Sequence, residues 1–85
     1  MKTLQAYIDS QNRWNALFNG YQFEIKTSAG RQKVADRISS DLSPENLTCD
    51  GELPRSQVQA RHRELTTAAR ELMSIDSNIK FYEFS

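Results

Sequence analysis

Two side chains are of the types used in nucleophilic catalysis: the single cysteine, Cys49, and the single histidine, His62. A catalytic thiol needs a nearby base, and a catalytic histidine needs a nucleophile and an orienting acid. His62 falls between Val58 and Leu65 on the predicted apolar side of a helix, which favours a histidine packed at the edge of the core. No sequence context joins it to Cys49. We therefore expect no enzymatic activity and no small-molecule substrate.

Metal chemistry is not indicated either. A lone cysteine cannot form an intramolecular disulfide, and it excludes a four-cysteine zinc site. Four carboxylates gather in one segment, but they lack the alternating ligand spacing and terminal glutamate of a calcium loop. They are Asp41, Glu45, Asp50 and Glu52. This segment is expected to be a solvated acidic loop, and no metal or cofactor is expected.

Three arginines fall on one stripe of the last predicted helix. Arg55, Arg63 and Arg70 share this stripe with Gln59 and Thr66, at spacings of three or four residues. Such a stripe could contact phosphates or an acidic protein surface. The chain has 11 basic and 11 acidic residues, whereas a nucleic-acid binder usually has a basic excess. The sequence therefore ranks nucleic acid behind protein as a partner of this stripe.

Aromatic residues are confined to the two ends of the sequence, and none lies between residues 24 and 80. This distribution predicts that the two ends meet and build the bulky part of the core. Trp14 and Tyr82 are the aromatic candidates for an exposed contact with a partner. The open edge of a predicted strand, Ile79–Phe84, is a further candidate because an extended peptide can add to it.

Length and composition bound the remaining possibilities. At 85 residues the chain forms one domain, residues 1–85. Leu, Ile, Val and Phe together number 18, which predicts a folded domain with a thin core that gains from a partner or from self-association. Net charge is +3 for residues 1–37, −4 for residues 38–52 and +1 for the remainder, a pattern that permits docking between charged surfaces. No secretory or membrane-spanning segment is seen, so the expected location is the cytoplasm.

The elements that must position these residues follow from periodicity and capping signals. Apolar spacing predicts helices over Leu4–Phe18, from Thr27 or Ser28 to about Leu42, and from Pro54 to about Asp76. Ser43-Pro44-Glu45 predicts a short helical turn ending at Leu47 or Thr48. Alternating residues predict strands over Tyr21–Lys26 and Ile79–Phe84.

The expected fold is therefore α+β, with three helices and a two-stranded antiparallel ribbon in the order α-β-α-α-β. An all-α helical bundle is the alternative. The expected function is a non-enzymatic protein–protein interaction module that binds another protein or itself. In size and in lacking a catalytic motif, the chain resembles accessory proteins of phages and mobile elements that modulate host factors. The alternative function is a nucleic-acid-associated regulator that uses the arginine stripe.

Overall fold

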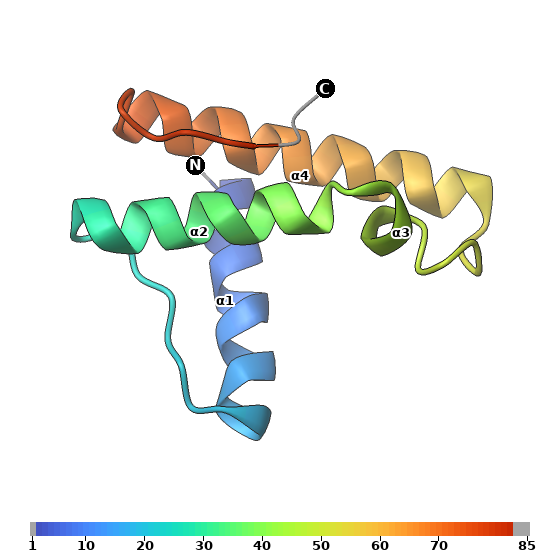
Figure 1. Ribbon diagram of the computed structural model, residues 1–85, viewed down its shortest axis with the longest axis horizontal. Coiled ribbons are helices and arrows are strands. Elements are labelled where there is room, and N and C mark those ends of the chain that lie inside the picture. The colour runs from blue at the N-terminus through green and yellow to red at the C-terminus, as the bar shows by residue number, and fades with distance from the viewer. Residues whose placement is uncertain (1, 83–85) are drawn as a thin grey trace.

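The computed structural model describes residues 2–82, and its regular elements are four helices (Figure 1). They are α1 (Lys2–Phe18), α2 (Ser28–Asp41), α3 (Pro44–Leu47) and α4 (Arg55–Ile75). Helices α2 and α4 lie side by side and antiparallel, while α1 crosses them and extends its C-terminal end away from the pair (Figure 1). No strand occurs within residues 2–82, so the predicted α+β ribbon is wrong and the all-α alternative fits.

Most predicted helix boundaries are confirmed, because local signals specify them. The Thr27 hydroxyl caps α2 by accepting a hydrogen bond from the Gly30 backbone N–H at 3.0 Å. Pro44 opens α3 at the first helical position, where its missing N–H costs nothing. Gly20 ends α1 with a φ of 71°, a conformation that glycine adopts without strain. Thr3 is wrong as the predicted cap of the first helix, since α1 already includes it.

The core is a small aliphatic cluster where α1, α2 and α4 meet. Helix α1 contributes Leu4 and Ile8, and the segment after α4 contributes Ile79. Helices α2 and α4 fill the rest with small and branched side chains: Val34, Ala35, Ile38, Ala68, Ala69 and Leu72. Alanines on α2 and α4 let the two backbones approach closely, which is consistent with a compact core in a chain with few large apolar residues.

The predicted aromatic core is wrong. No aromatic side chain within residues 2–82 is fully buried. Phe23, Phe81 and Tyr7 pack against the aliphatic cluster but stay partly exposed. The other described aromatics, Trp14, Phe18, Tyr21 and Tyr82, are exposed. The aromatic rings therefore lie around and beyond the core.

Residues of both predicted strands are irregular and pair with helix side chains instead of with each other. The Asn12 carboxamide of α1 donates to the Phe23 carbonyl at 3.0 Å and accepts from the Phe23 N–H at 2.6 Å. The Gln32 carboxamide of α2 does the same for Lys80, at 2.8 and 3.2 Å. In Figure 1, α2 lies between the two segments. Since carboxamides satisfy the backbone groups that a ribbon would have paired, no ribbon is needed.

Helix α4 turns a different face to the core than the sequence pattern indicated. Leu65, Ala69 and Leu72 are buried as expected, and Ala68 joins them. His62 and Met73, which the apolar stripe included, are exposed. The expectation of a packed histidine is therefore wrong.

Among the described residues, no helix combines the length and apolar character needed to cross a membrane.

Candidate functional site

Two of the predicted contact arginines share one shallow groove on α4, called the α4 groove here. Arg63 and Arg70 lie along it, on the side of α4 that faces α3. The remaining lining comes from α4 and from one α3 residue: Val58, Gln59, His62, Thr66, Thr67 and Leu47. Thus two arginines of the stripe line a surface depression, and His62 lines the same depression.

The α4 groove is basic because two arginines line it and no carboxylate does. Within residues 2–82, neither Arg63 nor Arg70 takes part in an ion pair, so both guanidinium groups are open to an anionic ligand. The Thr66 hydroxyl is already engaged, since it donates toward the helix carbonyls of His62 and Arg63 at 2.9 and 3.0 Å. The groove therefore offers donors and positive charge, with few acceptors.

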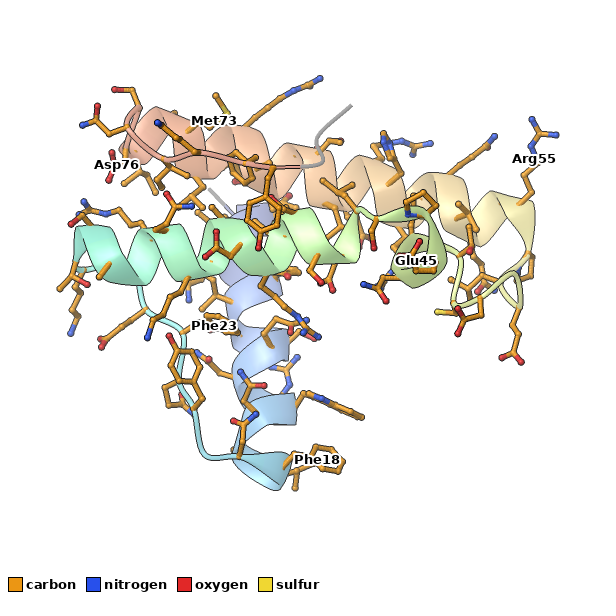
Figure 2. All side chains as sticks on the ribbon, viewed as in Figure 1. Phe18, Phe23, Glu45, Arg55, Met73 and Asp76 are labelled. Carbon is orange, nitrogen blue, oxygen red and sulfur yellow. The ribbon has the colours of Figure 1, made fainter. Side chains whose placement is uncertain are left out.

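Arg55 does not belong to the α4 groove. It is the first residue of α4 and points away from the body at the free end of that helix (Figure 2). The three predicted arginines are thus divided into a pair in the groove and one outlier. Arg55 can add long-range charge, but the structure places it outside the groove lining.

A second exposed feature lies at the C-terminal end of α1, called the α1 tip here. It comprises Trp14, Leu17 and Phe18, which are 57%, 79% and 66% exposed. The rings of Trp14 and Phe18 contact each other with a centroid distance of 4.4 Å and are tilted by 41°. Figure 2 shows Phe18 at the far end of α1, away from the α2–α4 pair. Contiguous exposed apolar side chains of this size often mark a contact surface.

The structure does not bring Tyr82 together with Trp14. Tyr82 is exposed and ends the described part of the segment after α4, whereas the α1 tip lies at the opposite side of α2 (Figure 1). The predicted strand edge at Ile79–Phe84 is not formed by its described residues, because Ile79 is buried in the core and Lys80 bonds to Gln32. Phe84 lies outside the described residues.

Sequence reasoning missed a buried polar pair between α1 and α2. The Tyr7 hydroxyl donates to Asp41 Oδ2 at 2.7 Å, and Arg37 Nε lies 3.5 Å from Asp41 Oδ1. Asp41 is only 6% exposed, so it does not belong to a solvated acidic loop as expected. The four-residue spacing of Arg37 and Asp41 is a signal that could have indicated this pairing.

Burial controls the protonation of the Tyr7 phenol. Burial of the Tyr7 phenol raises its pKa far above the usual value, and the negative charge of Asp41 and the hydrogen bond to it raise it further. The positive charges of Arg37 and Arg61 act in the opposite direction, more weakly. Tyr7 therefore remains a neutral hydrogen-bond donor, and the arrangement does not supply a reactive phenolate.

The two residue types considered for catalysis stay apart from any cluster. Cys49 is an exposed free thiol in the turn that follows α3. In the described part of the chain, no group of three or more His, Cys, Asp and Glu side chains could hold a metal ion. The best-formed surface features of the described residues are thus the α4 groove and the α1 tip.

Comparisons with known proteins return no matching family model, no similar curated protein and no similar solved structure. The surfaces described above are therefore the ground for any functional conclusion.

Proposed function

We propose that this protein is a nucleic-acid-associated regulator that contacts backbone phosphates through the α4 groove. The observation that carries the proposal is the groove's composition: two arginines that form no ion pair with the described residues, a histidine and an amide, with no carboxylate among the lining residues. Arginine and amide side chains that line a depression along one helix are typical phosphate contacts. In this proposal the protein acts by binding, in the cytoplasm, and no residue has a catalytic role.

The proposed binding is weak and depends strongly on salt. The chain as a whole has no net charge, so long-range attraction is small. Two arginine–phosphate contacts predict a slope of log K against log salt of about −2, since each neutralised phosphate contributes roughly −0.9 on duplex DNA. A slope of this size indicates that only a few phosphates are contacted, whereas attraction to a broadly basic surface would give a steeper slope.

The test is fluorescence anisotropy with labelled duplex DNA and single-stranded RNA at low and physiological salt. We expect saturable binding at low salt that falls by about tenfold or more for the double variant Arg63→Ala/Arg70→Ala, because both phosphate contacts are lost. Arg13→Ala is the matched control. Arg13 is an exposed arginine on α1, so Arg13→Ala removes one positive charge from another surface, as Arg63→Ala or Arg70→Ala alone removes one from the groove.

If Arg13→Ala loses as much binding as Arg63→Ala or Arg70→Ala does alone, the effect is one of general charge and the proposal is contradicted. The absence of binding to both nucleic acids at low salt would also contradict it. Circular dichroism of each variant checks that the fold is retained.

A second candidate function is protein binding, including self-association, and the α1 tip favours it. Three large apolar side chains lie uncovered on a helix end that extends from the body. Aromatic residues are enriched at the centres of protein interfaces, where they bury much area. Tyr82 is a separate exposed aromatic that could contribute to a different contact.

Analytical sedimentation of the purified protein over a range of concentrations tests whether it associates with itself. A mass that rises with concentration and falls back to the monomer in Phe18→Ser would support it. A binding partner of another kind predicts a monomer that captures one defined protein, with capture lost in Phe18→Ser and kept in Arg13→Ala. A monomer that captures nothing specific would contradict this candidate.

A further inference from the structure

A cleft separates the N-terminal half of α1 from the middle of α4, on a different face of α4 from the α4 groove. We call it the α1–α4 cleft. Its volume is about 470 Å³, within the range of small-molecule sites. The polar side chains that line it and matter here are Lys2, Tyr7, Gln11, Asp41, Arg61 and Glu64.

Part of the lining is held in place by the buried pair described above. The Tyr7 hydroxyl and both Asp41 oxygens are used within the protein, at 2.7 Å to each other and 3.5 Å to Arg37. These groups are therefore fixed and do not compete for a ligand. Arg61 lines the same cleft as this fixed pair.

Two polar atoms of residues that line the cleft are themselves buried and have no hydrogen-bond partner within residues 2–82. They are the carbonyl oxygen Oε1 of Gln11 and the guanidinium nitrogen Nε of Arg61. One is an acceptor and the other a donor. A buried donor or acceptor is normally paired, so each side chain gains a hydrogen bond when it turns this atom toward a ligand in the cleft.

The chemistry of the two atoms selects the ligand. The Nε edge of a guanidinium group presents two parallel N–H groups, which match the two oxygens of a carboxylate. Lys2 adds positive charge to the same cleft. Gln11 Oε1 needs an N–H donor, and the nearby carboxylate of Glu64 favours one. Asp41 and Glu64 both disfavour a doubly charged phosphate.

We propose that the α1–α4 cleft binds an α-carboxylate together with its neighbouring α-nitrogen. Arg61 pairs with the carboxylate, and Gln11 accepts the N–H of the α-nitrogen. Two sources carry this chemistry: a free amino acid, and the last residue of a peptide chain. The inference does not depend on the α4 groove, because Arg61 and Gln11 do not line that groove.

The test is a titration of the isotope-labelled full chain, followed by the backbone amide signals in nuclear magnetic resonance. Four probes separate the requirements: alanine, N-acetylalanine, N-acetylalanine amide and propionate. We expect saturable shifts centred on Gln11 and Arg61 with alanine or N-acetylalanine. Loss of the paired group predicts affinity lower by about tenfold or more for propionate, which lacks the N–H, and for the amide, which lacks the carboxylate.

The relative affinities of the first two probes identify the source. Tighter binding of alanine indicates a free amino acid, and tighter binding of N-acetylalanine indicates a peptide end. Either result supports the proposed binding of an α-carboxylate and its α-nitrogen in the cleft. Equal binding of propionate and N-acetylalanine would overturn the role of Gln11, and the absence of saturable shifts with all four probes would overturn the proposal.

Three variants assign the residues. Arg61→Lys keeps the charge but removes the paired N–H edge, and Gln11→Ala removes the acceptor. Each should lower affinity by about tenfold. Arg13→Ala, on the exposed side of α1, should leave it unchanged. If Arg61→Lys binds like the parent protein while its melting temperature is also unchanged, the carboxylate contact is refuted.

Discussion

The two halves of α1 have the same local structure, but their large apolar side chains lie in opposite environments. In the N-terminal half, Leu4 and Ile8 are 1% and 4% exposed. In the C-terminal half, Trp14 and Phe18 are 57% and 66% exposed, although the same apolar spacing continues through them. The difference is the presence of neighbours: α4 packs on α1 near its beginning, and the far end extends beyond the α2–α4 pair. Amphipathic periodicity therefore identifies an apolar face, whereas burial also requires an element that covers it.

The largest expected effect comes from a leucine pair on this one helix. Leu4→Ala removes a fully buried side chain and should lower the free energy of unfolding by about 2–5 kcal/mol. Leu17→Ala changes the same residue type at 79% exposure and should stay within about 0.5 kcal/mol. Urea denaturation of both variants measures the contrast. Similar losses at the two positions would show that the two halves of α1 are buried alike.

The next effect concerns the polar anchor of the buried half. Tyr7→Phe leaves the buried Asp41 carboxylate without the 2.7 Å bond from the phenol. A hydrogen bond to a charged group contributes about 1.5–3 kcal/mol, and a loss of that size is expected. Tyr21→Phe is the matched control, because Tyr21 is exposed. Chemical denaturation at neutral pH compares them, and equal stability of Tyr7→Phe and the parent would argue against a structural role for this bond.

The same phenol predicts a dependence on alkaline pH. The pKa of Tyr7 is raised in the folded protein, chiefly by burial. The stabilisation from this group is therefore complete below the ordinary tyrosine pKa of about 10, and it is lost as the pH rises above that value. Melting temperatures measured across this range should fall more steeply in the parent than in Tyr7→Phe. Parallel curves for the two proteins would contradict the buried, neutral phenol.

A smaller effect is expected where the exposed half of α1 meets the following segment. Asn12→Ala removes both hydrogen bonds to the Phe23 backbone. Each such bond contributes a net stabilisation of about 0.5–1.5 kcal/mol, so the loss of both should lower the free energy of unfolding by about 1–3 kcal/mol. Faster amide hydrogen exchange at Phe23 would show the release of the segment. Gln22→Ala, an exposed change in the same segment, should leave exchange at Phe23 unaltered.

The smallest effect on folding is expected at the α1 tip. Trp14→Ser should change the free energy of unfolding by less than about 0.5 kcal/mol, because the ring is largely in solvent. Any larger loss in denaturant would mean that this end of α1 is covered after all. A change in sedimentation without a change in stability would instead assign the α1 tip to association.

The comparison also shows how far sequence patterns reach in this chain. Thr27, Pro44 and Gly20 mark helix ends through their own backbone and side-chain chemistry, so those boundaries could be predicted. The strand expectation failed because alternation over residues 21–26 suits a strand but does not choose its partner. Asn12 satisfied that segment's backbone instead, a contact between residues 11 positions apart.

The residues of the candidate sites also fall into two groups, those that the sequence identified and those that only the structure shows. The sequence identified Arg63, Arg70 and Trp14 as contact residues, and the structure leaves all three exposed. It placed His62 on the wrong face, because the core side and the groove side of α4 are neighbouring faces: Leu65 is buried and the next residue, Thr66, lines the groove. It gave no indication of the α1–α4 cleft, since Gln11 and Arg61 come together only through the crossing of α1 and α4.

The sequence by itself determined most of the helix ends and which residue types each helix carries, because capping and helical spacing act between near neighbours. The tertiary structure alone decided which faces are covered. Crossing α1 over the α2–α4 pair buried Leu4 and Ile8, left Trp14 and Phe18 in solvent, and enclosed Tyr7 with Asp41. These outcomes depend on the packing of residues far apart in the chain, and local spacing carries no information about that packing.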